Sequence, residues 1–332
     1  MVAQPIIERS LAHLPTHLTA VFVGATSGIG EYTLKSFAKH CPHPKAYFIG
    51  RSPTAGARIL SELKAQNPAG QYTFIPSDIS LLKNVDAVCQ QIKEKEQHIN
   101  MLVLSQGTMV QGVDTPEGLH LPASLILHSR ARFIANLLPE LRRAPTLRRV
   151  LSIFTGTKEG PIVNPDLQMR NAGVSVLKLR GQAASVMTMY LSHFAKLAPD
   201  VSFVHDFPGP VRSNIAREGG VAMTVMRVLF KALGPFVFIP DGVSGDRHLF
   251  LATSARYRAV VGGCDGVDAQ GEIAKAIDGE LGSGCYVVDQ VCESGDAEVV
   301  EVLKKVRDEG WDEKVWKHLQ EEFLRITGKE SL

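Results

Sequence analysis

Three glycines spaced as GxxxGxG lie within the segment Val21–Gly30 and could bind a phosphate anion. The segment opens with an apolar, β-branched run typical of a buried strand, and the residues after Gly30 have helical spacing. A glycine-rich turn between a strand and a helix presents backbone N–H groups at the positive end of a helix dipole. This arrangement predicts a site for the pyrophosphate of a dinucleotide. Its expected contacts are Gly24, Thr26, Ser27, Gly28, Ile29 and Gly30.

A second candidate position, Arg51 with Ser52, follows the next apolar run, Ala46–Ile49. In a dinucleotide site the residues after this strand contact the adenine ribose. A carboxylate there accepts hydrogen bonds from the ribose hydroxyls of NAD, whereas a guanidinium beside a hydroxyl would bind a 2′-phosphate. The pair therefore predicts NADP(H) as the cofactor, and the alternative is a solvated surface arginine.

The elements that would position these residues alternate between apolar strands and amphipathic helices. Strands are expected to end at Val23 and to cover Ala46–Ile49, Tyr72–Ile75, Asn100–Leu104, Arg149–Phe154, Val201–His205 and Cys285–Val288. Helices are expected from the glycine turn to about His40 and over about 54–66, 81–96, 122–141 and 174–197. The alternation predicts an α/β fold of the doubly wound (Rossmann) type, with a mostly parallel seven-stranded sheet in three α/β/α layers.

The same alternation predicts a single NADP(H)-binding domain over residues 18–290. Residues 1–17 are expected to form an N-terminal arm, and residues 291–332 a C-terminal helical extension. Residues 212–240, which are mostly apolar and follow the sixth strand, are expected to form a lid. Such a lid would line a large apolar cleft for a small-molecule substrate.

Composition limits the partners and the compartment. The net charge of +2 gives no reason to expect a nucleic-acid partner. Five cysteines without a CxxC pair indicate reduced thiols, a cytoplasmic protein and no metal site. Arg227 and Lys231 interrupt the apolar lid segment and argue against a membrane span, which leaves a peripheral membrane contact open. The oligomeric state stays open, a homodimer included.

The GxxxGxG spacing is similar to that of the short-chain dehydrogenase/reductase family, and three further strand ends support the resemblance. After the third strand, Ser77-Asp78-Ile79 resembles the family's adenine-contacting Asp and its apolar neighbour. After the fourth, Ser105-Gln106-Gly107 stands where the family carries Asn-Ala-Gly, and after the sixth, Pro208-Gly209 resembles the segment beside the nicotinamide. The resemblance implies an oxidoreductase. Its further expected cofactor contacts are Asp78, Ile79, Ser105, Gln106, Gly107, Pro208, Gly209 and Val211.

The catalytic pattern of the family is not kept. The family normally uses an Asn, a Ser, a Tyr and a Lys, and the last two are spaced as YxxxK on the fifth helix. Tyr190 is the one tyrosine of the expected helix 174–197, and the residue four positions later is Phe194. Tyr190 also lies too close to Pro208 to leave room for the rest of the helix, a turn and a strand.

Spacing back from the Pro-Gly segment assigns other residues to the four positions. Lys178 takes the place of the Tyr, and Gln182 takes that of the Lys. Thr155, just past the fifth strand, takes the place of the Ser and keeps its chemical type, while His128 takes that of the Asn. Alternative interpretations are a solvated helix residue for Lys178 and a buried, hydrogen-bonded histidine for His128.

Arg130 and Asp166 are two further charged candidates, one on the fourth helix and one beyond the fifth strand. They resemble the Arg and Asp used by atypical fungal biosynthetic members of the family that lack the Tyr. The reductase and Diels–Alderase group of malbrancheamide and paraherquamide formation is an example. The resemblance implies a charged pair that faces the substrate, and the alternatives are a structural salt bridge and a loop cap.

The altered site suggests a substrate class. Hydride addition to a ketone leaves an alkoxide that needs a proton donor, whereas addition to an iminium gives a neutral amine that needs none. Together with the resemblance to the atypical fungal members, this implies an NADP(H)-dependent reductase or dehydrogenase of fungal secondary metabolism, acting on an imine or iminium, an enone or a ketone of a natural-product intermediate. The alternatives are a non-redox cyclase or isomerase on the same scaffold and a non-catalytic NADP(H)-binding protein.

Overall fold

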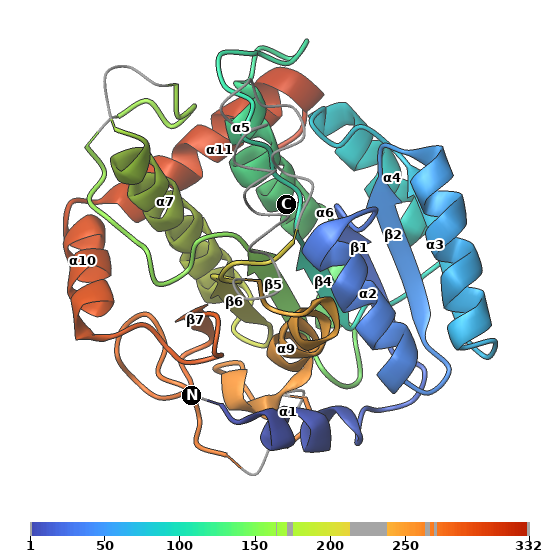
Figure 1. Ribbon diagram of the computed structural model, residues 1–332. Coiled ribbons are helices and arrows are strands. Elements are labelled where there is room, and N and C mark those ends of the chain that lie inside the picture. Colours follow the sequence, from blue (N-terminus) through green and yellow to red (C-terminus); the bar gives the residue numbers. More distant parts are fainter. Residues whose placement is uncertain are drawn as a thin grey trace.

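The computed structural model of the chain describes residues 2–163, 165–170, 175–212, 238–262, 266–268 and 271–330. Within them a seven-stranded parallel sheet has the order β3-β2-β1-β4-β5-β6-β7 (Figure 1). The strands are β1 Thr19–Val23, β2 Lys45–Gly50, β3 Gln71–Pro76, β4 Met101–Leu104, β5 Arg149–Ile153, β6 Ser202–Asp206 and β7 Cys285–Val288. The strand order reverses between β1 and β4, where folds of this type bind ligands beyond the strand ends. The predicted doubly wound α/β class is confirmed.

Helices cover both faces of the sheet (Figure 1). One face carries α1 Gln4–Leu11, α2 Gly28–His40, α3 Pro53–Gln66 and α9 Asp241–Thr253. The other carries α4 Leu82–Lys93, α6 Ser129–Arg142 and α7 Val176–Leu197, against which α10 Ala297–Asp308 and α11 Trp311–Thr327 pack. Successive strand residues enter opposite cores, so Phe22 packs near α2 while Val21 and Val23 join the other core. Burial on both faces explains why the strands are continuous apolar runs.

The helix expected over residues 122–141 is not continuous. It consists of α5 Leu121–Ala123, a π-helical turn η1 Ser124–His128, and α6. The N–H of Ser129 bonds to the carbonyl of Ser124, which adds one residue to that turn. A π turn changes the direction in which the following side chains project, and such turns are frequent at functional sites. Helix α9 was not anticipated from the sequence either.

The C-terminal helices share the core of the domain. Val315, Leu319 and Phe323 of α11 are buried in the same apolar cluster as the residues of α4, α6 and α7. Figure 1 shows α11 beside α7 and crossing towards α4. Among the helices of the described residues, none combines the length and the hydropathy of a membrane span. The predicted lid lies almost wholly in residues 213–237, outside the described residues, and stays a prediction.

Candidate active site

The glycine turn packs closely against the two residues that follow β4, Ser105 and Gln106. Gly24 has φ +82°, and a Cβ there would lie 2.7 Å from the amide nitrogen of Gln106. A Cβ on Gly30 would lie 2.3 Å from Ser105 Oγ. Ser27 stands at the N-cap of α2, but its side chain makes no capping hydrogen bond. The turn therefore packs tightly against the residues that follow β4, and the start of α2 has no side-chain cap, as an anion site needs.

The carboxyl ends of β2 and β3 lie on the same side of the sheet as the glycine turn. Thr26 packs against Gly50, where a Cβ would meet its side chain at 2.4 Å. Arg51 is exposed directly after β2, and Ser52 caps α3 by accepting a hydrogen bond from the amide of Ala55 at 3.2 Å. Both residues lie at the carboxyl end of β2, and their contact with the adenosine end of a dinucleotide stays a prediction.

Beyond β3, the exposed carboxylate of Asp78 accepts hydrogen bonds from the amide and hydroxyl of Ser80, at 3.1 and 2.8 Å. Ile79 beside it is buried. Ser105 joins β4 to β1, because both its amide and its hydroxyl donate to the carbonyl of Val23, at 3.0 and 2.9 Å. The carboxyl ends of β3, β2, β1 and β4 thus lie next to one another in the sheet.

The remaining expected cofactor contacts lie on the same side of the sheet. Gln106 is buried and Gly107 half-buried after β4. Pro208 and Gly209 follow β6 with partial exposure, and Gly209 has φ +70°. Val211 is 9% exposed. Because the strands are parallel, all these residues lie at the carboxyl ends of the strands.

Arg130 points into the interior. Its guanidinium, 1% exposed, donates hydrogen bonds to Ser152 Oγ and the carbonyl of Ile153, both at 2.9 Å, and to the carbonyl of Gln106. Burial lowers the pKa of this guanidinium to about 10. Because two of the acceptors lie at the ends of β4 and β5, Arg130 joins these strand ends.

Asp166 shapes the loop that follows β5. Its carboxylate accepts hydrogen bonds from the amides of Gln168 at 2.9 Å and Arg170 at 3.3 Å, and the Arg170 guanidinium lies 4.0 Å away. Arg130 is committed to strand-end acceptors, so the two residues form no ion pair with each other. The expected charged pair is wrong. A catalytic role for either residue stays a prediction.

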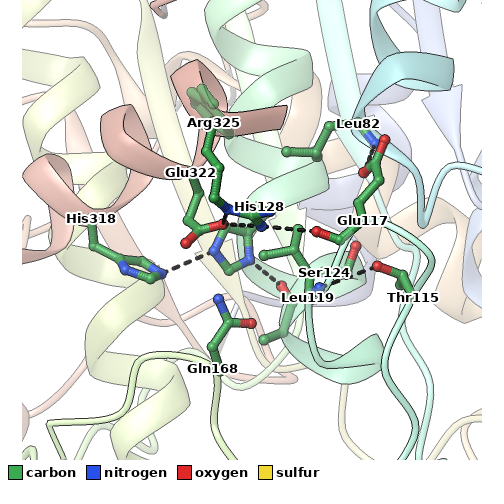
Figure 2. A network of polar contacts seen from close by, with 12 residues as sticks. Leu82, Thr115, Glu117, Leu119, Ser124, His128, Gln168, His318, Glu322 and Arg325 are labelled. Atoms are coloured by element: carbon green, nitrogen blue, oxygen red, sulfur yellow. Dashed lines mark hydrogen bonds and ion pairs between the residues drawn. The ribbon is translucent and has the colours of Figure 1, made fainter. Parts of the chain in front are cut away.

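His128 faces α11 from the last position of the π turn (Figure 2). Its Nδ1 lies 3.1 Å from the carbonyl of Ala123, and its Nε2 lies 3.0 Å from Nε2 of His318. A carbonyl can only accept, so Nδ1 of His128 carries the proton and His318 donates. Burial lowers the pKa of His128 to about 3, which keeps it neutral. The structure therefore agrees with the buried-histidine interpretation.

Lys178 and Gln182 lie on the first two turns of α7. Lys178 is exposed, and its amide donates to the N-cap hydroxyl of Ser175 at 3.4 Å. Gln182 is fully buried, and its Oε1 accepts a hydrogen bond from the amide of Val163 at 3.1 Å. Neither side chain reproduces a tyrosine hydroxyl beside an ammonium group.

Thr155 lies two residues beyond the end of β5, and its hydroxyl is buried without a hydrogen-bond partner among the described residues. Its amide donates to Nε2 of His205 at 3.2 Å. On the other side of the imidazole, Nδ1 lies 2.9 Å from Thr188 Oγ1, which donates to Glu159 Oε1 at 2.8 Å. These three buried polar residues were missed from the sequence. A histidine and an aspartate ending the apolar strand β6 were the available signal.

Comparison with known proteins agrees with this geometry. The family profile of short chain dehydrogenases matches residues 18–118. Oxidoreductase AN1596 of Emericella nidulans is 36% identical over 330 residues, covering 96% of this chain and 97% of that protein. The chain belongs to the short-chain dehydrogenase/reductase family. Another family member, SAT2 of Stachybotrys chartarum, is 27% identical over 348 residues and covers 96% of each chain.

A solved structure supports the fold of this short-chain dehydrogenase/reductase. The Pseudomonas aeruginosa RhlG/NADP active-site complex has a TM-score of 0.56 at 18% identity, covering 75% of this chain and 93% of that one. As a member of the family, the protein is an oxidoreductase. Its residues fit a dinucleotide, because the start of α2 has no side-chain cap and so leaves its first N–H groups to a phosphate. Across the described residues, no group of three or more His, Cys, Asp and Glu side chains could hold a metal ion.

Proposed function

We propose that this oxidoreductase is an NADP(H)-dependent reductase or dehydrogenase of fungal secondary metabolism with a non-standard active site. Its substrate is an apolar small molecule, and the reaction takes place in the cytoplasm. Arg51, exposed after β2 where NAD-binding sites carry a carboxylate, supports NADP(H). The NADP named with the RhlG structure agrees with this choice. The fungal relatives support the biological setting.

The observation that carries the proposal is the set of groups beyond β5. The Tyr and Lys positions hold an exposed lysine, Lys178, and a buried amide, Gln182. Thr155 keeps a hydroxyl at the Ser position, and this hydroxyl bonds to no described residue. A buried hydroxyl without a partner is costly unless a ligand supplies one. We assign Thr155 as the donor to a polar atom of the substrate.

This set of groups favours an acceptor that needs little acid catalysis. NADPH, when bound, supplies the hydride. Thr155 would orient the acceptor through one hydrogen bond, and the first residues of α2 with Arg51 would hold the phosphates. Because no tyrosine acid stands at this position, an iminium or an activated alkene suits the site better than a ketone.

The cofactor assignment is tested by calorimetry with NADPH and NADH. We expect NADPH to bind at least about tenfold more tightly, a difference of about 1.4 kcal/mol. Arg51→Asp should remove this preference, because the carboxylate repels a 2′-phosphate and accepts from ribose hydroxyls. Arg142→Asp, an exposed change at the far end of α6, is the control. Equal affinities in the unmodified protein would refute the assignment.

The reaction class is tested by following NADPH oxidation with a panel of cyclic imines, enones and ketones. We expect turnover of the imines or enones to exceed that of the ketones. Thr155→Val should lower kcat about tenfold or more, while Thr155→Ser, which keeps the hydroxyl, should retain most of it. Tight NADPH binding without turnover of any acceptor would favour the non-redox alternatives.

A further inference from the structure

A directional chain of hydrogen bonds lies in the core beside Thr155. A backbone N–H can only donate, so Nε2 of His205 accepts from Thr155 and carries no proton. The imidazole is therefore neutral with its proton on Nδ1, which donates to Thr188 Oγ1 at 2.9 Å. Thr188 in turn donates to Glu159 Oε1 at 2.8 Å. The chain runs from the amide of Thr155 to a buried carboxylate.

The loop that starts at Thr155 is also held at its other end. The amide of Gly160 donates to the carbonyl of Gly181 at 3.0 Å and to Ser185 Oγ at 3.1 Å. Between these ends, a Cβ on Gly156 would lie 2.2 Å from the carbonyl oxygen of His205. Thr157 has φ +64°, a left-handed conformation that β-branched residues seldom adopt. Such backbone outliers persist where the surrounding structure over-determines them, often at functional sites.

His205 occupies a strand position where an apolar residue would suffice for the core. The side chains of His205 and Glu159 are both 0% exposed, and Thr188 is fully buried as well. Buried polar groups are costly unless they are hydrogen-bonded, and the bonds of His205, Thr188 and Glu159 Oε1 connect them to Thr155. Phe154 lies parallel to the imidazole, with ring centroids 6.3 Å apart. These contacts hold the backbone of Thr155 on the side of the buried core.

We propose that His205 is a positioning residue, which holds the amide of Thr155 and thereby directs its hydroxyl at the substrate. Fixing the amide fixes the Cα–Cβ direction of the residue, so the hydroxyl has few orientations left. Thr188 and Glu159 keep the imidazole in the tautomer that accepts from Thr155. This inference rests on the proposed function for the role of the hydroxyl. The hydrogen bond itself is tested separately.

Two substitutions separate the hydrogen bond at Nε2 of His205 from the one at Nδ1. His205→Gln can place an amide oxygen near the Nε2 position and so keep an acceptor for Thr155. His205→Asn places its amide near the Nδ1 position, which keeps a donor to Thr188 and removes the acceptor. Amide hydrogen exchange over residues 153–160 reads the hydrogen bond directly. NADPH oxidation with the best acceptor of the panel gives kcat and KM, and calorimetry gives NADPH affinity.

In His205→Asn we expect the Thr155 amide to exchange at least about tenfold faster, because its hydrogen bond is lost. We expect kcat to fall about ten- to a hundredfold through misorientation, with KM and NADPH affinity unchanged. His205→Gln should keep exchange and kcat within about threefold of the unmodified protein. Equal losses of kcat in both variants would show a merely structural histidine and overturn the proposal.

A second pair keeps the proposal testable if His205→Asn does not fold. Thr188→Val removes the nearer acceptor for Nδ1 and leaves Glu159 Oε1, 3.4 Å away, as the remaining one, whereas Thr188→Ser keeps the hydroxyl. We expect changes of the same kind, but smaller, in the valine variant alone. If the unmodified protein oxidises NADPH with none of the acceptors, the proposed function fails. The exchange data still decide whether His205 holds Thr155, and unchanged exchange in His205→Asn overturns that claim.

Discussion

The two ends of the candidate site, at the carboxyl ends of β1 to β3 and of β5 and β6, carry different chemical groups. At the ends of β1 to β3, the expected contacts are backbone N–H groups and exposed side chains such as Arg51 and Asp78. At the ends of β5 and β6, the polar groups are buried side chains, with Arg130 1% and His205 0% exposed. Phosphate recognition needs close backbone, which glycine spacing encodes locally. Orientation of a reacting group needs side chains from distant segments, which no short motif encodes.

The largest effect is expected at the backbone-built end. Gly24→Val would place a Cβ 2.7 Å from the amide nitrogen of Gln106 in a left-handed conformation. We expect NADPH affinity, measured by calorimetry, to fall more than about a hundredfold. Gly242→Ala is the control, because Gly242 lies in α9 with nothing within 4 Å of its Cβ position. Retained affinity in Gly24→Val would remove the distinction between the two ends.

The buried end is tested by Arg130→Met. The substitution leaves the carbonyls of Gln106 and Ile153 and the hydroxyl of Ser152 without their donor. We expect urea unfolding to show a loss of about 3 kcal/mol, since unsatisfied buried acceptors are expensive. Arg142→Met on the same helix should cost less than about 1 kcal/mol, because it removes only a half-exposed ion pair with Asp200. A stable Arg130→Met would mean that burying the charge costs as much as its hydrogen bonds contribute.

The smallest effect depends on pH and concerns His128 behind the buried end. Its pKa is lowered to about 3 in the folded protein, below the ordinary value of about 6.5. The unfolded chain therefore binds the proton first, and stability is complete above about pH 6.5 and falls as pH decreases towards 3. Between pH 7.5 and 5.5 we expect His128 to contribute a loss of about 1 kcal/mol.

Urea unfolding at the two pH values measures this loss. His128→Gln should reduce it, because the titrating group is gone. His43→Gln is the control, since His43 is exposed and should leave the pH dependence unchanged. An undiminished slope in His128→Gln would assign the acid sensitivity to other groups.

Much of the fold was predictable, because buried parallel strands and glycine turns are local patterns. The predicted strand Cys285–Val288 agrees with β7 residue for residue. The π turn at Ser124–His128 was not predictable, because one extra residue in a helical turn leaves the apolar spacing of the segment nearly unchanged. The hydrogen bond of His128 to His318 of α11 could not be predicted either, because it joins residues far apart in the sequence.

The candidate site also has parts that local sequence patterns predict and parts that they do not. The placement of Arg51 after β2 followed from the strand end, and that of Thr155 after β5 from a strand end together with the family spacing. The charged pair of Arg130 and Asp166 was wrong because sequence spacing gives the element of a side chain but not the direction in which it points. His205 was overlooked because residues within an apolar strand were taken to contribute only to packing in the core.

The position of α11 affects how the chain folds during synthesis. The ribosome completes all seven strands before it makes α11, which covers apolar surface of α4 and α7 with Val315, Leu319 and Phe323. Until this helix emerges, that surface is open to solvent and to other chains. Incomplete chains with exposed apolar surface are prone to aggregation and are bound by chaperones. A premature stop after α10 would therefore yield an aggregating protein even though the sheet and the glycine turn were already complete.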